Sequence, residues 1–456
     1  MSHLIAAAAT PTGRGGVGIL RLSGEGAIAA AMEVFRPVGG RSLREAPDRT
    51  LLYGHVLDRE GQVIDSGLAF ASRAPHSYTG EETAELQCHG SPMVLSLALE
   101  ALFSAGARQA LPGEFTKRAF LNGKLDLTQS EAVIDLIDAE TPAGARQAAA
   151  QLGGGLLRRI EAVYDALVDV SAHFHAVLDY PDEDLTPFRA ETLGAVLQEQ
   201  NAALTRLLAT AKRGQLVRAG VSCAIVGRPN AGKSSLLNAL AGYERAIVTD
   251  IPGTTRDTVE VKVELGGVPF RLVDTAGLRD SDDPIERMGV ERSRAAMEEA
   301  SLVLVVWDSA QPVTDEDIAL LRQAAADHPA VLVWSKRDLT SAPLPPIPLP
   351  DGVSTVELSA HTGEGLDRLE DTLSALAGLA GDEGGGEVLT NARQTDAARR
   401  GQEAIHRAGE GLDMGIPPDL LLTDVEEAMN ALGELTGRTV REDVTARIFQ
   451  RFCVGK

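Results

Sequence analysis

Residues 221–240 read VSCAIVGRPNAGKSSLLNAL, and this stretch decides the fold of the middle of the chain. An apolar run at 221–226 leads into the pattern G-x-x-x-x-G-K-S at 227–234, and a helical run follows at 235–240. Glycines in such a loop let backbone N–H groups curl around phosphates at the start of a helix, where the helix dipole favours anions. Strand, glycine-rich turn and helix in this order predict a P-loop.

Two side chains of this loop carry the expected chemistry. Lys233 is expected to meet the charge of the β- and γ-phosphates, and the Ser234 hydroxyl is expected to bind Mg²⁺. Asp274-Thr275-Ala276-Gly277 follows a later apolar run. Its Asp can reach Mg²⁺ through water, and its Gly N–H can meet the γ-phosphate. Between the two motifs, Gly253-Thr254-Thr255-Arg256-Asp257 supplies Thr255 to complete the coordination of the metal and to order a switch loop.

The identity of the base is predicted from a third motif. Ser335-Lys336-Arg337-Asp338 follows an apolar run, at the place where guanine-binding proteins carry N/T-K-x-D. Asp338 would accept the ring N–H and the exocyclic amine of guanine, and Lys336 would pack its stem over the base. Ser359-Ala360 matches the last loop of such a site. GTP is therefore favoured over ATP. Ser335 stands where Asn or Thr is usual, so we expect weaker guanine affinity with selectivity kept.

The usual catalytic glutamine is missing from the sequence. Ras-type enzymes carry a water-orienting Gln just after the D-x-x-G motif, and here that position is Leu278. An aliphatic side chain cannot orient water, so a bound cation, a distant carboxylate or a partner has to help. Glu286 is the nearest candidate carboxylate. The alternative is that Glu286 is an ordinary solvated acid at the start of a helix.

Length and charge limit the possible functions. A chain of 456 residues is too long for one ordinary core and predicts two or three domains. Its 65 acidic and 43 basic residues give a formal net charge of -22. A protein that holds nucleic acid by neutralising phosphates usually has the opposite balance, so tight non-specific nucleic-acid binding is disfavoured. A local basic groove, or a partner that carries the RNA, stays open.

Cysteine usage and hydropathy indicate a reducing, cytoplasmic location. Cys88, Cys223 and Cys453 are far apart and odd in number, which gives no disulfide framework. Cys88 beside His89 suggests a metal site only weakly, since no second ligand pair stands at a recognisable spacing. No apolar run in the sequence reaches the ~18 residues that span a bilayer. The N-terminus has neither a basic region followed by an apolar core nor an Arg-rich transit pattern.

The pattern of apolar residues along the chain predicts a multidomain fold. Mixed β-like and helical runs indicate an α+β domain over residues 1–125, and strands alternating with helices over 216–380 predict a Ras-like α/β P-loop domain with a mostly parallel sheet. Helical periodicity marks the segments 126–215 and 381–456, the second beginning with the Gly-rich linker 381–386. The simplest arrangement is one discontinuous helical domain with the α/β domain inserted into it.

Several stretches together resemble the MnmE (TrmE) family, GTPases that modify the wobble uridine of certain tRNAs. Besides the GTPase motifs, they are TPTGRGGVG at 10–18, PGEFT at 112–116, AFLNGKLDL at 119–127 and FCVGK at 452–456. The resemblance extends over the whole chain. Phe452–Lys456 and Thr10–Gly18 are far more specific than the P-loop.

The resemblance implies that the N-terminal domain binds a tetrahydrofolate derivative (5-formyl or 5,10-methylene) and forms a homodimer. The folate-binding positions of the family fall on Arg21, Glu85, Lys124 and Lys456. Basic groups suit the glutamate tail of that ligand, and a carboxylate suits its pterin edge. Without the family, Arg21 and Lys124 would be read as surface charges. Cys453 matches the family's FCVGK stretch, and both a structural and a reactive thiol stay open.

The resemblance also suggests what replaces the missing glutamine. The family is described as potassium-activated, with the G domains of a dimer pairing across their nucleotide faces. A cation beside the β/γ bridge neutralises developing charge as an arginine finger would. Glu286 matches the family's general base acting through water, and Arg279 lies in the same segment. The K⁺-ligand positions are Asn230, Thr249, Ile251 and Thr254, and the GTP contacts comprise Asn230, Ala231, Gly232, Lys233, Ser234, Ser235, Thr249, Asp250, Ile251, Pro252, Gly253, Thr254, Thr255, Asp274, Thr275, Ala276, Gly277, Ser335, Lys336, Asp338, Ser359 and Ala360.

The family works with an FAD-dependent flavoprotein, MnmG, in a heterotetramer or larger assembly that acts on tRNA. Together they would form the 5-carboxymethylaminomethyl or aminomethyl group on uridine from a one-carbon folate, with GTP hydrolysis driving domain movement. Two other functions remain open from the residues. One is a GTPase switch in ribosome assembly or translation. The other is a folate-dependent one-carbon transferase with a regulatory nucleotide domain.

Overall fold

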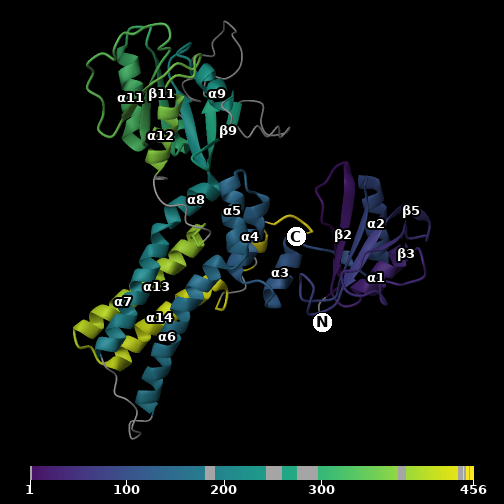
Figure 1. The fold of residues 1–456 in the computed structure, drawn as a ribbon. Coiled ribbons are helices and arrows are strands. Elements are labelled where there is room, and N and C mark those ends of the chain that lie inside the picture. The colour runs from purple at the N-terminus through teal and green to yellow at the C-terminus, as the bar shows by residue number, and fades with distance from the viewer. Residues whose placement is uncertain are drawn as a thin grey trace. The chain divides into compact units, whose positions relative to one another are not determined.

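The computed structural model describes residues 3–179, 190–242, 259–274, 296–377 and 387–439, together with 445, 448–450 and 452–455 (Figure 1). These residues form two compact units. The first consists of Met1–Ile134, Leu152–Asp165 and Met429–Lys456, and the second consists of Asp135–Gln151 and Ala166–Ala428. Both units therefore combine segments that are far apart in the sequence.

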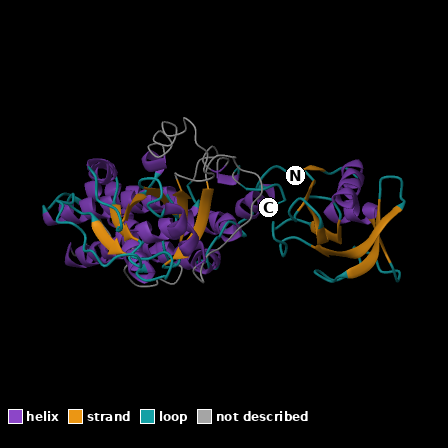
Figure 2. Ribbon diagram, turned by 90° about the horizontal axis from the view of Figure 1, so that it is seen from above, coloured by secondary structure: helices purple, strands orange, loops and turns teal. Residues whose placement is uncertain are grey.

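A seven-stranded sheet forms most of the first unit, with the order β3-β4-β5-β6-β2-β1-β7. Every neighbouring pair in it is antiparallel except β1 and β7. Two helices cover one face, as the purple helices above the orange strands of this unit show in Figure 2. The elements are β1 (Ile5–Ala8), β2 (Gly15–Ser23), α1 (Ala27–Val34), β3 (Phe35–Pro37), β4 (Leu52–Leu57), β5 (Val63–Ser72), β6 (Thr83–Gly90), α2 (Pro92–Ser104) and β7 (Arg108–Gln109).

Alternating burial along the central strands explains why one sheet face is covered and the other presents polar groups. In β6, Ala84, Leu86 and Cys88 are buried in the core beneath α1 and α2, whereas Glu85 and Gln87 point to the opposite face. This face positions the candidate site of the first unit. Strands β2, β5 and β6 and helix α2 give this part of the chain the mixed α+β character that the sequence predicts for residues 1–125.

The segment near the C-terminus packs against the N-terminal residues of the same unit. Gly455 has a φ of 99°, and a Cβ placed there would lie 2.1 Å from the Ala8 carbonyl oxygen, so only glycine fits. Gly113, which precedes helix α3 (Glu114–Leu121), would likewise bring a Cβ to 2.5 Å from the Phe449 carbonyl oxygen. The Gly113 N–H also donates to the Cys453 carbonyl oxygen at 3.4 Å, so the family-like stretch at 112–116 meets residues 452 and 453.

A nearly buried arginine holds α3 in place. The Arg118 side chain donates to Glu81 at 2.8 Å, to Glu114 at 2.9 Å and to the His3 carbonyl oxygen at 2.7 Å. Burial alone raises the pKa of Glu114, but hydrogen bonds from Arg108, the Leu111 N–H and Arg118 outweigh it and lower the pKa to about 2. This carboxylate consequently stays ionised at neutral pH.

Helices from before and after the inserted domain lie side by side in the second unit, where α7 packs along α13 (Figure 1). Gln402 donates across this contact to Asn201 at 2.7 Å. The predicted discontinuous helical domain is therefore present. Its helices, some of which extend into the first unit, are α4 (Leu127–Ile137), α5 (Pro142–Leu152), α6 (Gly155–Asp179), α7 (Ala190–Ala209), α8 (Ala211–Ala219), α13 (Ala392–Asp413) and α14 (Pro418–Thr436).

The inserted domain contains a six-stranded sheet with the order β13-β12-β11-β8-β10-β9. All neighbouring strands are parallel except the edge pair β9 and β10, as the predicted mostly parallel sheet requires. Helices α9 and α12 pack on one face and α11 on the other. The elements are β8 (Val221–Val226), α9 (Lys233–Gly242), β9 (Val259–Leu265), β10 (Val268–Asp274), β11 (Leu302–Asp308), α11 (Asp315–Asp327), β12 (Ala330–Ser335), β13 (Ser354–Glu357) and α12 (Leu366–Ala377).

The chain enters and leaves this domain at neighbouring points. The Leu389 N–H donates to the Thr210 hydroxyl at 3.3 Å, and a Cβ on Gly214 would lie 2.2 Å from the Leu389 carbonyl oxygen. Such closeness is typical of an insertion into a continuous domain. Among the helices that the structure describes, none is both long enough and apolar enough to cross a membrane.

Candidate functional site

The loop between β8 and α9 has the shape of a phosphate cradle. Gly227 has a φ of 152°, and a Cβ there would lie 2.4 Å from the Val306 carbonyl oxygen, so a side chain would push the loop off strand β11. Gly232 at 106° and Asn230 at 59° also have positive φ values. Loops with positive φ values before a helix are typical of sites where backbone N–H groups bind an anion at the helix N-terminus.

Lys233 lies inside the loop that precedes it. Its side chain is 5% exposed, and Nζ donates to the carbonyl oxygens of Gly227 and Arg228, both at 2.8 Å. The ammonium group is thus held at the centre of the turn by the backbone. Ser234 and Ser235 follow it in the first turn of α9 and are exposed.

Two residues of the predicted Mg²⁺ site, Ser234 in α9 and Asp274 at the end of β10, lie within the described ranges. Strand β10 ends at Asp274, which pairs with Ile225 of β8 directly before the P-loop. A serine hydroxyl and an aspartate carboxylate are hard oxygen donors, the ligands that Mg²⁺ prefers. Ser234 and Asp274 therefore fit the metal in their chemistry, and the strand register puts residue 274 next to the strand that leads into the P-loop.

The predicted guanine-reading segments lie at the end of β12 and after the end of β13. Asp338 is exposed, and its Oδ1 accepts a hydrogen bond of 2.6 Å from the buried Ser359 hydroxyl. This hydrogen bond lowers the pKa of Asp338, so its carboxylate is ionised at neutral pH. Ala360 follows Ser359 in the same loop. The structure therefore brings the two predicted base-reading segments into direct contact.

Ser335 points toward the P-loop. Its side chain is 2% exposed, and its Oγ lies 2.7 Å from the Ala231 carbonyl oxygen and 3.0 Å from that of Trp307. A hydroxyl has one proton to donate, so the shorter contact to Ala231 is the stronger of the two. The expectation that Ser335 weakens guanine affinity stays a prediction, and its test is tighter GDP binding after Ser335→Asn.

Thirteen predicted site residues cannot be placed. They are Thr249, Asp250, Ile251, Pro252, Gly253, Thr254, Thr255, Thr275, Ala276, Gly277, Arg279, Glu286 and Lys456, and all of them lie outside the described residues.

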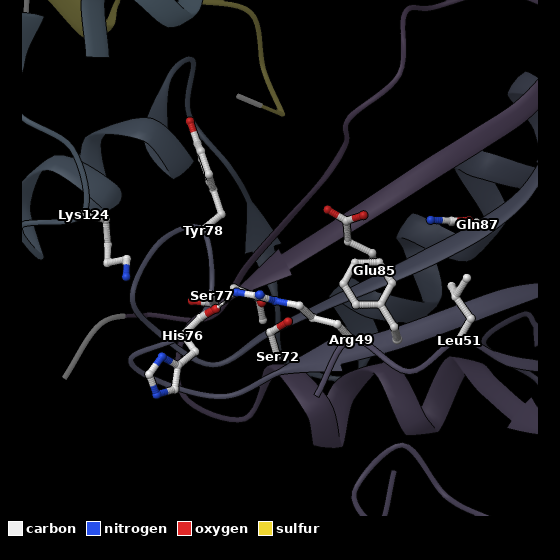
Figure 3. A pocket seen from close by; sticks show the side chains of 11 residues that line it. Arg49, Leu51, Ser72, His76, Ser77, Tyr78, Glu85, Gln87 and Lys124 are labelled. Atoms are coloured by element: carbon white, nitrogen blue, oxygen red, sulfur yellow. Dashed lines mark hydrogen bonds between the residues drawn. The ribbon is translucent and has the colours of Figure 1, made fainter. Parts of the chain in front are cut away.

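The first unit contains a second candidate site on the polar face of its sheet (Figure 3). A cavity of about 610 Å³ lies there, with Glu85, Gln87 and Lys124 among the residues that line it. Glu85 and Gln87 come from β6, and Figure 3 shows them on the side of the cavity opposite Lys124 and His76. Tyr78 lies between the two ends, so a flat, partly apolar ligand with different groups at its two ends would suit this shape.

Arg21 connects this cavity to the C-terminal segment. Its Nε donates to Glu85 Oε1 at 2.7 Å, and its Nη1 donates to the Gly455 carbonyl oxygen at 3.4 Å. The guanidinium also lies 5.6 Å from the centroid of the Tyr78 ring. Arg21 and Glu85 are therefore brought together, and Lys124 lies on the wall of the same cavity.

Cys88 and His89 do not form a metal site in the structure. Burial raises the pKa of the Cys88 thiol to about 11, and the side chain belongs to the core under α2. The His89 ring points the other way and pairs with Asp65 at 2.8 Å. Within the described ranges, no group of three or more His, Cys, Asp or Glu residues is placed to hold a metal ion.

Sequence reasoning missed several residues that line or support these sites. Asp308 ends β11 and binds Lys336, and Arg49, His76 and Gln87 line the cavity. An acidic residue directly after the apolar run 302–307 is a signal that could have identified Asp308. No local signal marks Arg49 or His76, because loops bring them to the sheet face.

Family models match nearly the whole chain. The model described as the MnmE helical domain matches residues 127–453, and the model described as the GTP-binding protein TrmE N-terminus matches residues 4–124.

Curated proteins named tRNA modification GTPase MnmE align with the full chain. The protein of Chloroflexus aurantiacus is 48% identical over 459 residues and covers 100% of both chains. A protein of Thermus thermophilus is 47% identical over 456 residues, with 99% of both chains covered. Among solved structures, the G domain of the T. maritima FeoB iron transporter is 26% identical, with a TM-score of 0.26 over 34% of this chain and 98% of that chain.

Proposed function

Since the chain belongs to the MnmE (TrmE) family, we propose that it hydrolyses GTP in order to modify the wobble uridine of certain tRNAs. The observation that carries the GTP part is the convergence of Lys233 and Asp338 at the same edge of one sheet, each after the carboxyl end of a parallel strand. Ligands of open α/β sheets bind at that edge.

The P-loop would bind the phosphates through its N–H groups and Lys233, and Asp338 would accept the guanine N–H groups. Mg²⁺, held by Ser234 with Thr255 and by Asp274 through water, would neutralise charge on the β- and γ-phosphate oxygens. Ser335 would stabilise the loop that binds the phosphates, because its hydroxyl at the end of β12 donates to the Ala231 carbonyl oxygen.

For hydrolysis we propose the arrangement that the family resemblance implies. Asn230, Thr249, Ile251 and Thr254 would bind K⁺, and Glu286, with Arg279 nearby, would orient the attacking water. Among the described residues, Asn230 supports this proposal. It lies in the P-loop after β8, and it is exposed. A cation at this place would offset the charge that develops at the β/γ bridge.

GTP hydrolysis is expected to be at least about tenfold faster in KCl than in NaCl at equal ionic strength, because the cation stabilises charge that develops in the transition state. Glu286→Ala should slow hydrolysis in KCl and leave the dissociation constant of GDP nearly unchanged. Phosphate release and GDP titration measure the two quantities. Equal rates in both salts would remove the cation from the proposal.

We further propose that the cavity of the first unit binds a tetrahydrofolate derivative, 5-formyl or 5,10-methylene. The Glu85 carboxylate would accept from the N–H groups of the pterin, while Lys124 would meet the carboxylates of the glutamate tail at the other end. Arg21 orients Glu85 through their ion pair, and it also contacts the Gly455 carbonyl oxygen. Lys456, which follows Gly455 in the sequence, would add a second positive charge for the ligand.

Glu85→Gln is expected to weaken 5-formyltetrahydrofolate binding at least about tenfold, since a hydrogen bond to a charged acceptor is lost. Isothermal titration would measure it. Glu100→Gln is a matched control, because Glu100 is an exposed acid on α2 that does not line the cavity. Unchanged folate binding in Glu85→Gln would place the ligand elsewhere.

The proposed partners are a second copy of the chain, an FAD-dependent MnmG-type protein and tRNA, in the cytoplasm. An exposed apolar pair on the sheet of the first unit supports the homodimer: Tyr53 and Leu68 stand directly opposite each other and are 54% and 36% exposed. The net charge of -22 agrees with a flavoprotein partner that carries much of the RNA contact.

The proposal is tested by mass analysis of wobble nucleosides in tRNA from a strain that lacks the protein. The account predicts that 5-carboxymethylaminomethyl and aminomethyl uridines are lost and return with a plasmid copy. If these nucleosides persisted and ribosomal subunits, instead of a flavoprotein, co-purified with the chain, the GTPase would be a ribosome-assembly switch.

A further inference from the structure

Two successive residues at the end of β12 hold two successive carbonyl groups of the P-loop. The Ser335 hydroxyl lies 2.7 Å from the Ala231 carbonyl oxygen, and Lys336 Nζ donates to the Asn230 carbonyl oxygen at 2.7 Å. Asn230 and Lys336 both have a φ of 59°, which places each in the left-handed region. The base-reading loop and the phosphate loop therefore form one connected unit.

Asp308 fixes the lysine of this connection from the neighbouring strand. It ends β11, directly opposite Ser335 in the parallel register. Its Oδ2 accepts from Lys336 Nζ at 2.8 Å, and its Oδ1 accepts from the Ala310 N–H at 2.9 Å. The Asp308 side chain is only 10% exposed, so both oxygens are directed by protein donors more than by water.

The position of the lysine ammonium follows from these two acceptors. Lysine has four rotatable side-chain bonds. Because the Asp308 carboxylate and the Asn230 carbonyl both accept from the same ammonium, they restrict Lys336 to a narrow set of rotamers. With its ammonium fixed, the methylene stem of Lys336 crosses from β12 toward the P-loop. That stem is the surface on which the guanine ring would lie.

We propose that Asp308 is a positioning residue for guanine-nucleotide binding and acts through Lys336. The proposal rests on the GTP-binding function of this domain. Asp308 would contact neither the base nor the phosphates. Its charge orders the Lys336 stem and, through the same ammonium, keeps the Asn230 peptide in the shape that receives phosphate.

The test is a double-mutant cycle on the full chain, with a fluorescent GDP analogue as the probe. Asp308→Asn keeps the size of the side chain and removes its charge, and it should raise the dissociation constant about 10- to 100-fold. Lys336→Met keeps the stem and removes the ammonium, and it should raise the constant by a similar factor. Both changes break the same Asp308–Lys336 ion pair. The double variant should therefore bind the GDP analogue no more weakly than whichever single variant has the higher dissociation constant.

A merely structural role would give different readouts. A positioning role predicts a rise in KM for GTP that exceeds any fall in kcat, with faster release of the GDP analogue. Asp327→Asn serves as the matched control, since Asp327 is an exposed acid at the end of α11. Thermal unfolding without nucleotide shows whether each variant is folded, and Lys336→Met tests the same contact if Asp308→Asn does not fold.

Two results would overturn the proposal: wild-type GDP affinity in Asp308→Asn or in Lys336→Met, or independent effects that multiply in the double variant. Either result would leave the GTPase function intact, provided that the wild-type chain binds GDP. Failure of the wild-type chain to bind GDP would instead refute the proposed function itself.

Discussion

Lys233→Ala is expected to lower kcat/KM for GTP about 10²- to 10³-fold, mainly through a fall in kcat. The ammonium is nearly buried and is held by two loop carbonyls at 2.8 Å. A charge placed in advance needs no reorganisation when negative charge moves onto the β–γ bridging oxygen. Alanine leaves the turn without its cation at that point.

Steady-state phosphate release with varied GTP measures this loss. Lys212→Ala is the matched control, because Lys212 is an exposed lysine on α8 outside the nucleotide site. Circular dichroism should show both variants folded. Activity within a factor of about three of wild type in a folded Lys233→Ala variant would contradict the assignment of residues 227–234 as a phosphate-binding loop.

Asp338→Asn should weaken GTP binding about 10²- to 10⁴-fold and at the same time improve binding of xanthosine triphosphate. Asp338 is ionised and its Oδ1 is fixed by the Ser359 hydroxyl at 2.6 Å. A carboxylate can accept two N–H groups from the guanine edge, whereas an asparagine amide offers one acceptor and one donor group. Xanthine carries a carbonyl where guanine carries its amine, so the amide donor finds a partner there.

Competition against a fluorescent GDP analogue gives the affinities for both triphosphates. Asp351→Asn changes an exposed acid in the turn before β13 and should leave both affinities unchanged. Weaker GTP binding without any gain for xanthosine triphosphate would mean that Asp338 supports the loop and does not read the base.

The described strands of the inserted domain could be predicted from the sequence because they are local and strongly apolar. The runs at 221–226, 302–307 and 331–334 are buried on both faces, and each coincides with a strand of the sheet. The P-loop motif then fixes which ends of these strands form the site. Strand β13 is short, since only Ser354–Glu357 pairs with β12.

Long-range contacts could not be predicted from the residues alone. The packing of Gly455 on Ala8 joins the two ends of the chain, and nothing in the local pattern around residue 455 indicates its partner. No local pattern around Arg118 indicates burial, yet its side chain is nearly buried and forms ion pairs with two glutamates. The cavity lining shares this property, because the side chains that form it come from β6 and from separate loops.

The contacts of Ser335 and Lys336 with the P-loop also could not be predicted from the sequence, because they join segments that are distant in the chain. The prediction of weaker guanine affinity considers only the missing amide at 335, and the contact of the Ser335 hydroxyl with the Ala231 carbonyl is additional to it. This contact depends on the distance between two loops that are 104 residues apart in the sequence. Comparing residue 335 alone with the usual motif gives no information about that distance.

Selection of guanine over adenine is the claim on which the account of this protein depends, and titration of the purified chain with GDP and with ADP tests it most directly. We predict that GDP binds at least about 100-fold more tightly than ADP, because adenine presents no pair of N–H groups to Asp338. Equal dissociation constants for the two nucleotides would contradict the account.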